Sequence, residues 1–311
     1  MAVFYKLDEL PEGIKNTIVT IGNFDGVHKG HQTIFKKVVN RASDLKCTSV
    51  AVTFEPHPVK IKSPDTAKPL ITLLEQKTEL IASQGIDIVL LINFTPDFSS
   101  ISAHDFVKNI LLEKLKTQEI VVGYDYVFGY NREGNIELLK KLGKQYDFIV
   151  HQVEPVYIEK TLVSSTMIRN LVMNGDVSVA SKLLGRSYQI RGKVVKGRNR
   201  GASILGYPTA NLEFEDELFP KEGVYIVKVD MGGKIYQALT NIGHNPTFKD
   251  SELSIETHIL DFSENILGTR IKINFLSRLR DEISFSSVQE LTTQINSDIK
   301  VAKDFFQENI K

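Results

Sequence analysis

The fold of the first half of the chain is decided by one stretch, Gly22-Asn23-Phe24-Asp25-Gly26-Val27-His28-Lys29-Gly30-His31. It follows Thr17–Ile21, an apolar run typical of a buried strand, and it opens a segment with helical spacing over His31–Leu45. In an open α/β sheet, nucleotides bind where a strand ends and a helix begins, because free backbone N–H groups and the helix dipole attract phosphate. The stretch therefore predicts a nucleotide-binding α/β domain.

The residue types within this stretch suit a phosphate-binding loop. Gly22 and Gly26 permit tight backbone turns, and Gly30 removes a side chain where a ligand approaches. His28 and His31 lie three residues apart, so on one helical turn they point the same way. Two imidazoles placed there can donate hydrogen bonds to charge that develops on an α-phosphate and on a leaving pyrophosphate.

Two other interpretations of the histidine pair stay open. A metal site is one, but zinc needs further ligands, and His57, His104 and His151 are scattered without ligand spacing. A purely structural turn is the other, although two histidines and flanking glycines coincide at a strand-to-helix junction. Neither GxxxxGK[ST] nor GxGxxG occurs, which excludes a Walker-type ATPase and a typical NAD site.

Predicted strands and helices alternate along the first 184 residues. The strands are Thr17–Ile21, Ser49–Phe54, Ile86–Phe94, Ile120–Gly123 and Phe148–Val150; the helices are His31–Leu45, Leu73–Ser83, Ala103–Leu115, Ile136–Tyr146 and Ser165–Leu184, the last interrupted at Asn174–Asp176. This alternation predicts a parallel sheet with helices on both faces, and the apolar strands agree with that burial. We therefore predict a Rossmann-like α/β domain over residues 1–184.

After Gly185 the pattern changes to strands in which polar and apolar residues partly alternate. These strands are predicted at Gln189–Val195, Val224–Val229, Ile235–Thr240, Leu253–Leu260 and Arg270–Phe275, and an amphipathic helix runs from Ser287 to about Glu308. The run Met231-Gly232-Gly233-Lys234 is typical of a tight hairpin turn. Five or six antiparallel strands closed by one helix predict a small β-barrel domain over residues 185–311.

Length and composition are typical of a soluble protein with two domains. The 311 residues are 42% hydrophobic and 24% charged, which excludes disordered and collagen-like chains. Basic and acidic residues number 38 each, and this balance disfavours a non-specific nucleic-acid binder. A single cysteine, Cys47, excludes an intramolecular disulfide, and no segment resembles a signal peptide or a transmembrane helix. These features predict a cytoplasmic protein.

A basic, glycine-containing segment opens the second domain. Arg191–Gly201 holds five basic residues in its first ten positions and no acidic residue. A solvated hairpin and an RNA-binding barrel are both alternatives, but the interleaved aromatic residues that stack on RNA are missing. Thr209 and Asn211 follow, and their side-chain oxygens suit Mg²⁺ held mainly by nucleotide phosphates. The residues of this predicted ATP·Mg²⁺ site are Gly197, Gly206, Pro208, Thr209 and Asn211.

The GNFDGVHKGH stretch resembles the HxGH pattern of nucleotidylyltransferases, and its long form is similar to the adenylyltransferase half of the bifunctional prokaryotic riboflavin kinase/FAD synthetases. Three further segments fit that family in order: Thr53–Pro58, Val122–Gly129 and Ser164–Arg169. The last can also be an ordinary helix cap with a solvated arginine, whereas the resemblance makes it a phosphate clamp. The implied catalytic residues are His28 and His31, and the implied ATP-binding residues are Gly22, Asn23, Phe24, Asp25, Gly30, Ser165, Thr166 and Arg169.

Two positions of the first domain are less defined by the resemblance. Asp125 would bind a flavin or ribose hydroxyl, or would only end a strand. The family commonly has a basic, glycine-containing loop ending in Asp where this chain has Tyr130–Asn135. Asn135 keeps a polar side chain but lacks the charge, so no metal or flavin role is assigned to this loop.

The second domain resembles riboflavin kinases over Leu205–Leu212, Gly223–Tyr225, Asn241–Phe248 and Ser254–Ile259. The resemblance implies that Thr209 and Asn211 hold Mg²⁺ and ATP, and that Glu256 activates the terminal ribityl hydroxyl of the flavin. A carboxylate that accepts this proton helps an alcohol to attack a γ-phosphate. The alternative for Glu256 is an outward-facing strand residue without a function. No flavin ligand is named in Phe275–Glu282, because Ser-Arg-Leu looks inserted there.

The resemblance covers essentially the whole chain and implies two reactions. Riboflavin and ATP would give FMN and ADP in the second domain, and FMN and ATP would give FAD and pyrophosphate in the first. Mg²⁺ is the implied cofactor and ATP the co-substrate, whereas nucleic acid, a membrane or an obligate protein partner is not expected. The alternatives are another nucleotidylyltransferase fused to a β-barrel binding module, and an RNA-binding or regulatory module.

Overall fold

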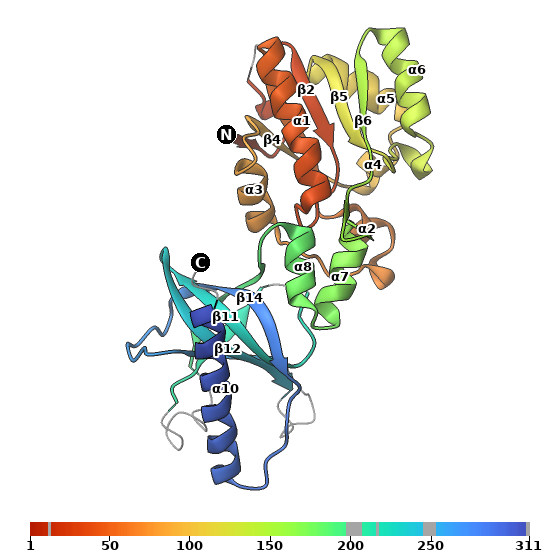
Figure 1. Cartoon of the computed structure of the whole chain (residues 1–311). Helices are drawn as coiled ribbons and strands as arrows, with labels where there is room; N and C mark the ends of the chain where they lie inside the picture. Colours follow the sequence, from red (N-terminus) through yellow and green to blue (C-terminus); the bar gives the residue numbers. More distant parts are fainter. Residues whose placement is uncertain (12–13, 197–206, 216–217, 245–252, 309–311) are drawn as a thin grey trace. The chain divides into compact units, whose positions relative to one another are not determined.

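The computed structural model describes residues 1–11, 14–196, 207–215, 218–244 and 253–308 of the chain. Its internal contacts divide the chain into two compact units, Met1–Ser165 and Thr166–Lys311. The first unit is coloured red to green in Figure 1 and the second green to blue. One unit holds a parallel sheet and the other a closed barrel, which are the two predicted architectures.

The first unit is built on a six-stranded parallel sheet (Figure 1). Its strands lie in the order β1-β4-β3-β2-β5-β6, with the bounds Ala2–Phe4 (β1), Thr17–Ile21 (β2), Thr48–Glu55 (β3), Ile88–Asn93 (β4), Thr117–Gly123 (β5) and Ile149–Val153 (β6). The predicted parallel sheet is confirmed. The sequence pattern did not show β1, because a strand of three residues is too short to display a periodicity.

Helices cover both faces of this sheet. They are α1 (Lys29–Leu45), α2 (Pro58–Lys62), α3 (Leu74–Ala82), α4 (Pro96–Ser99), α5 (Ala103–Asp105) with a π-helical continuation over Phe106–Lys114, and α6 (Ile136–Tyr146); short 3-10 turns lie at Leu7–Glu9, Pro64–Thr66 and Tyr130–Arg132, and β7 (Tyr157–Ile158) pairs with β8 (Thr161–Leu162). Side chains of β2 alternate between two cores, Val19 and Ile21 on one face and Ile18 on the other. Burial on both faces explains why the β2 sequence is apolar throughout.

The chain first adds strands to one side of β2 and later adds strands to its other side. From β2 the chain goes to β3 on one side, whereas β5 joins the other side of β2 with Thr20 paired to Val121. The carboxyl ends of β2 and β5 therefore meet at the topological switch point, which is where ligands bind in open α/β sheets. The loop between β2 and α1, hereafter the β2–α1 loop (Gly22–His28), and the turn after β5 lie at this edge.

The second unit contains a closed six-stranded antiparallel barrel and a C-terminal helix (Figure 1). Its elements are α7 (Ser165–Met173), α8 (Val177–Leu184), β9 (Tyr188–Val195), β10 (Ala210–Phe214), β11 (Gly223–Met231), β12 (Lys234–His244), β13 (Leu253–Ile259), β14 (Arg270–Arg280) and α10 (Val288–Glu308). The barrel order is β10-β13-β12-β11-β14-β9. The predicted barrel with a C-terminal helix is confirmed, and the strand not predicted as such is β10.

Local signals in the second unit behave as the sequence predicts. Met231 pairs with Lys234, and Gly232 and Gly233 have φ values of 60° and 86°, so the hairpin turn uses the conformational freedom of glycine.

The helix α10 is attached to the barrel by Arg280, whose guanidinium donates to both carboxylate oxygens of Asp298 at 2.7–3.1 Å. Such bidentate pairing fixes the position of the helix along the barrel.

The helices α7 and α8 belong to the same compact unit as the barrel. Gly175, between them, has φ 86°, and a Cβ there would lie 2.6 Å from the Cδ atom of Arg278 on β14. The Arg278 guanidinium also donates to the backbone oxygen of Glu222 and to Asp281. The compact division thus falls at Ser165/Thr166, whereas the composition change predicts a functional boundary at residue 184. That functional boundary remains a prediction.

Candidate active sites

The β2–α1 loop is shaped by close packing of its own side chains. Phe24 is buried with φ 49°, and Gly26 has φ 84°. A Cβ on Gly22 would lie 2.9 Å from the Phe24 ring, so this glycine makes room for the ring. A Cβ on Gly30 would lie 3.1 Å from the His28 ring. The space at Gly30 was predicted to admit a ligand, and its nearest neighbour in the structure is the His28 imidazole.

His28 and His31 form a stacked pair at the beginning of α1. Their ring centroids are 3.6 Å apart and their planes are inclined by 17°. Nδ1 of His28 accepts a hydrogen bond from the backbone N–H of His31 at 3.3 Å, so the proton of neutral His28 resides on Nε2. Burial and the neighbouring His28 hold the pKa of His31 well below its ordinary value. The lowered pKa keeps the His31 ring neutral at the switch point, so that ring retains one N–H donor.

Three predicted ATP-binding residues use polar groups to hold the loop in place. The Asp25 carboxylate accepts hydrogen bonds from the backbone N–H groups of Ile71 and Thr72, and Asp25 is only 4% exposed. The backbone oxygen of Asp25 accepts from the Ser165 hydroxyl at 3.0 Å, and that of Asn23 accepts from a β3 hydroxyl at 3.2 Å. These groups stabilise the loop internally, and their roles as ATP contacts stay predictions.

The remaining predicted residues of the adenylyltransferase site lie on two elements. Thr166 and Arg169 are on α7, where Arg169 is buried. Asp125 is exposed in the turn after β5, and its Oδ1 lies 3.3 Å from the position of a Cβ on Gly123. Asp125 therefore occupies the switch-point edge to which the β2–α1 loop also belongs.

The loop over residues 130–135 is hydrogen-bonded to the beginnings of α5 and α6. Asn135 caps α6, with Oδ1 accepting from the backbone N–H of Leu138 at 2.9 Å. The carboxylate of Glu133 accepts from the backbone N–H of Ala103 at 2.7 Å. The polar side chain at position 135 thus has a structural partner at the beginning of α6.

Three polar residues stand in register across neighbouring strands of the barrel. Glu256 on β13 pairs with Asn211 on β10 and with Asn241 on β12. All three are half-buried on the outer face, because the β13 residues on either side of Glu256 are buried in the barrel. Burial, together with the nearby carboxylate of Glu282, raises the pKa of Glu256. Glu282 in turn accepts a hydrogen bond from the Asn241 amide at 3.0 Å.

The segment before β10 is held against this polar row. Nδ1 of His258 donates to the backbone oxygen of Pro208 at 2.9 Å, and the Tyr207 hydroxyl donates to Asn296 of α10 at 2.6 Å. Thr209 is half-buried directly before β10. The structure therefore brings Thr209, Asn211 and Glu256 to one side of the barrel. Gly197 and Gly206 lie outside the described residues.

Sequence reasoning did not assign two residues that the structure places beside Glu256. Asn241 belongs to a segment that carried the kinase resemblance, but its register opposite Glu256 depends on the pairing of β12 with β13. Glu282 lies in the segment for which no ligand was named, and its position over the row depends on the path of β14. Neither could be recognised from spacing along the chain.

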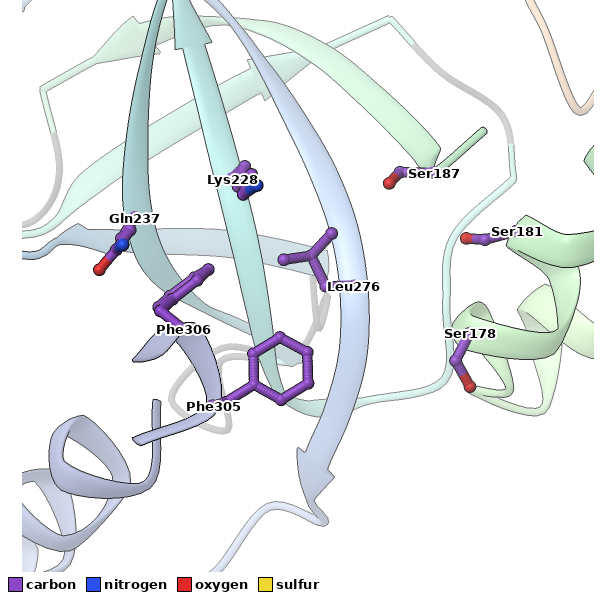
Figure 2. A pocket seen from close by; sticks show the side chains of 8 residues that line it. All are labelled: Ser178, Ser181, Ser187, Lys228, Gln237, Leu276, Phe305 and Phe306. Carbon is purple, nitrogen blue, oxygen red and sulfur yellow. The ribbon is translucent and has the colours of Figure 1, made fainter. Parts of the chain in front are cut away.

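Two cavities are lined by residues other than the predicted site residues. One of about 350 Å³ on the second unit is lined by α8 serines, barrel side chains and the end of α10 (Figure 2): Ser178, Ser181, Ser187, Lys228, Gln237, Leu276, Phe305 and Phe306. The other, of about 570 Å³, follows the Lys29–Asn40 side of α1. Within the described ranges, no group of three or more His, Cys, Asp or Glu residues could hold a metal ion, and no helix has the length and apolarity to cross a membrane.

Two family models match consecutive parts of the chain. One is described as FAD synthetase and covers residues 10–167; the other is described as riboflavin kinase and covers residues 184–306. The bifunctional riboflavin kinase/FMN adenylyltransferase of Buchnera aphidicola (from Acyrthosiphon pisum) is 36% identical over 98% of both chains. The chain belongs to the bifunctional riboflavin kinase/FMN adenylyltransferase family.

Further relatives agree with this family membership. The Escherichia coli K12 member is 32% identical and covers 97% of this chain and 96% of its own, and the Pseudomonas fluorescens member is 37% identical over 93% of each. A crystal structure described as a macrolide-efflux protein from Streptococcus pneumoniae is 31% identical, with a TM-score of 0.86 over 97% of this chain and 98% of that one. The fold of the whole chain, the parallel-sheet unit and the barrel together, therefore recurs in that solved structure.

Proposed function

We propose that the chain makes FMN from riboflavin and ATP at the outer face of the barrel, and then makes FAD from FMN and a second ATP at the β2–α1 loop. The observation that carries this proposal is that one member of this family holds two separate groups of polar side chains suited to these reactions. A stacked imidazole pair lies at the switch point, and an in-register Asn-Glu-Asn row lies on the barrel. ATP, riboflavin, FMN and FAD are the ligands.

In the first reaction, Glu256 accepts the proton of the terminal ribityl hydroxyl while that oxygen bonds to the γ-phosphorus and the bond to the β-phosphate oxygen breaks. ADP leaves, and the phosphoryl group becomes that of FMN. The raised pKa of Glu256 makes its carboxylate a better proton acceptor near neutral pH. Asn211 and Asn241, on either side, can orient the hydroxyl and the phosphates by hydrogen bonding.

In the second reaction, an FMN phosphate oxygen bonds to the α-phosphorus of ATP, and the bond from this phosphorus to the β-phosphate oxygen breaks. Pyrophosphate leaves and FAD remains. Nε2–H of His28 and a ring N–H of His31 donate to the oxygens on which charge develops. Thr166 and Arg169 on α7 carry a hydroxyl and a guanidinium, groups of the type that binds phosphate, and they stay predicted ATP contacts.

The donor set on the barrel fits a magnesium ion. Thr209 and Asn211 would contribute neutral oxygen ligands, and Mg²⁺ prefers a few protein oxygens together with phosphate oxygens and water. The ion would neutralise charge on the transferred phosphate group. The alternative function, a nucleotidylyltransferase fused to a binding module, predicts no phosphorylation at the barrel. The predicted cytoplasmic location is compatible with these soluble substrates.

One incubation tests the proposal. The purified full chain is mixed with riboflavin, ATP and MgCl₂, and the flavins are separated by chromatography over time. We expect FMN first and FAD afterwards, and neither product when EDTA replaces MgCl₂. FAD formation from added FMN without any phosphorylation of riboflavin would support the alternative function and overturn the kinase assignment. If neither riboflavin nor FMN is converted, both the kinase and the adenylyltransferase assignments are overturned.

A further inference from the structure

A buried contact joins the β2–α1 loop to a segment 46 residues further along the chain. The Asp25 carboxylate accepts from the backbone N–H of Ile71 at 2.9 Å and from that of Thr72 at 3.1 Å. In return, the Thr72 hydroxyl oxygen accepts from the backbone N–H of Gly26 at 3.0 Å. Thr72 is 2% exposed, so water does not compete for these bonds. The contact is reciprocal, with each segment donating to the other.

The Thr72 hydroxyl is fully used in this contact. Its oxygen accepts from the Gly26 N–H, and its proton points to Oδ1 of Asp25 at 3.4 Å. A methyl group in place of the hydroxyl would leave the Gly26 N–H buried without this acceptor. Buried backbone N–H groups without a partner are strongly disfavoured, so the loop would move to find another one.

The loop held by Thr72 has an unfavourable backbone. Phe24, Gly26 and Val27 have φ values of 49°, 84° and 39°, in the left-handed region that residues with a Cβ avoid. Such a conformation persists only where surrounding contacts impose it. His28 and His31 follow directly, and His28 is the cap of α1. A change of the backbone at Gly26 would therefore displace the imidazole pair.

A buried lysine supports the same arrangement by its charge. Lys77 on α3 is 5% exposed, and its ammonium donates to the backbone oxygen of Phe54 at 3.3 Å and lies 3.8 Å from Glu55. Burial lowers the pKa of Lys77, while the carboxylates of Glu55 and Asp25 act against that effect. The negative charge of Asp25 beneath the loop thus has a nearby positive charge.

We propose that Thr72 is a positioning residue for adenylyl transfer, which sets the Gly26–Val27 backbone and through it the His28 and His31 rings. The proposal rests on the proposed reaction at the β2–α1 loop, and Thr72, which is buried, would act through the loop backbone and not by contact with a substrate. Because a misplacement of about 1 Å can lower a rate by about 10²-fold, removal of the hydroxyl should reduce kcat for FMN adenylylation by about 10- to 10²-fold. The KM for ATP should change much less.

The test compares three full-length variants. Thr72→Val removes the hydroxyl, Thr72→Ser retains it, and Thr78→Val removes a threonine hydroxyl that bonds only within α3. We expect the kcat loss in Thr72→Val alone, with Thr72→Ser and Thr78→Val within about threefold of wild type. Riboflavin phosphorylation should be unchanged in all three. Wild-type FMN adenylylation by a folded Thr72→Val variant would overturn the proposal.

Amide hydrogen exchange tests, independently of activity, whether the Thr72 hydroxyl holds the β2–α1 loop in place. The peptide covering Gly22–His31 should exchange faster in Thr72→Val than in wild type, while the second half of α1 stays protected in both. Unchanged exchange in this peptide would overturn the proposal even if the rate falls. If wild type itself does not adenylylate FMN, the proposed function fails, and the exchange result still decides whether Thr72 holds the loop. Should Thr72→Val unfold the first unit, Thr72→Ala removes the same hydroxyl with less bulk.

Discussion

Replacing Glu256 by glutamine removes the proposed proton acceptor of the kinase reaction while keeping the shape of the side chain. The amide can still hydrogen-bond within the row formed with Asn211 and Asn241. Burial and repulsion by the Glu282 carboxylate both raise the pKa of Glu256, and the neutral variant is free of both effects. Folding should therefore survive, and a loss of activity reports on proton transfer.

The expected magnitude follows from two opposing effects. Loss of a general base costs about 10²–10⁴-fold in rate. The loose transition state of phosphoryl transfer relies mostly on positioning and reduces the cost, whereas the raised pKa of Glu256 makes the carboxylate a stronger base and increases it. We therefore expect riboflavin phosphorylation to fall by about 10²-fold or more.

The assay measures riboflavin phosphorylation at saturating ATP and adenylylation of added FMN in the same preparation. Glu213→Gln is the matched control, because Glu213 is an exposed carboxylate on β10, two residues after Asn211. In wild type, the kinase rate should decline as the pH is lowered, with a midpoint above the ordinary glutamate pKa of about 4.3. This decline at acid pH should be absent from the pH profile of Glu256→Gln. Kinase turnover within about threefold of wild type would show that Glu256 is not the base.

Three further predictions concern the first site, the pH dependence of stability and the attachment of α10. His28→Ala and His31→Ala should each lower FAD formation from FMN by about 10²–10³-fold with riboflavin phosphorylation intact, and wild-type FAD synthesis in either folded variant would contradict this. The Arg41 guanidinium, hydrogen-bonded to Glu119, holds the pKa of that carboxyl below its usual range. The ionised Glu119 therefore stabilises the fold above about pH 4.3, and this stabilisation is lost as the pH falls through the lower pKa of the folded state. Thermal unfolding should be less acid-sensitive in Glu119→Gln than in wild type between about pH 5 and 3. Asp298→Ala removes the buried carboxylate that pairs with the half-buried Arg280 on β14 and should lower the free energy of unfolding of the barrel unit by about 1–3 kcal/mol in urea titrations, and an unchanged midpoint would refute it.

Local pattern was sufficient for the elements that carry a strong periodic signal. The prediction of Thr17–Ile21 and of Ile136–Tyr146 agrees with β2 and α6 residue by residue, and the hairpin turn at Met231–Lys234 is confirmed. An apolar run buried on both faces, an amphipathic helix with an asparagine cap and a Gly-Gly turn each need only neighbouring residues to be recognised. The same locality allowed a nucleotide site to be predicted at the junction after Ile21.

By itself, the sequence determined the two architectures, the order in which they occur and the residue types of the candidate sites. Only the tertiary structure decided which groups meet: Asp25 with Thr72, Glu256 with Asn241 and Glu282, and Gly175 with Arg278. Each contact depends on strand order, on barrel register or on a close approach between elements distant in the chain. Periodicity reports which face of an element is buried, but the partner on that face is selected by packing across the whole unit.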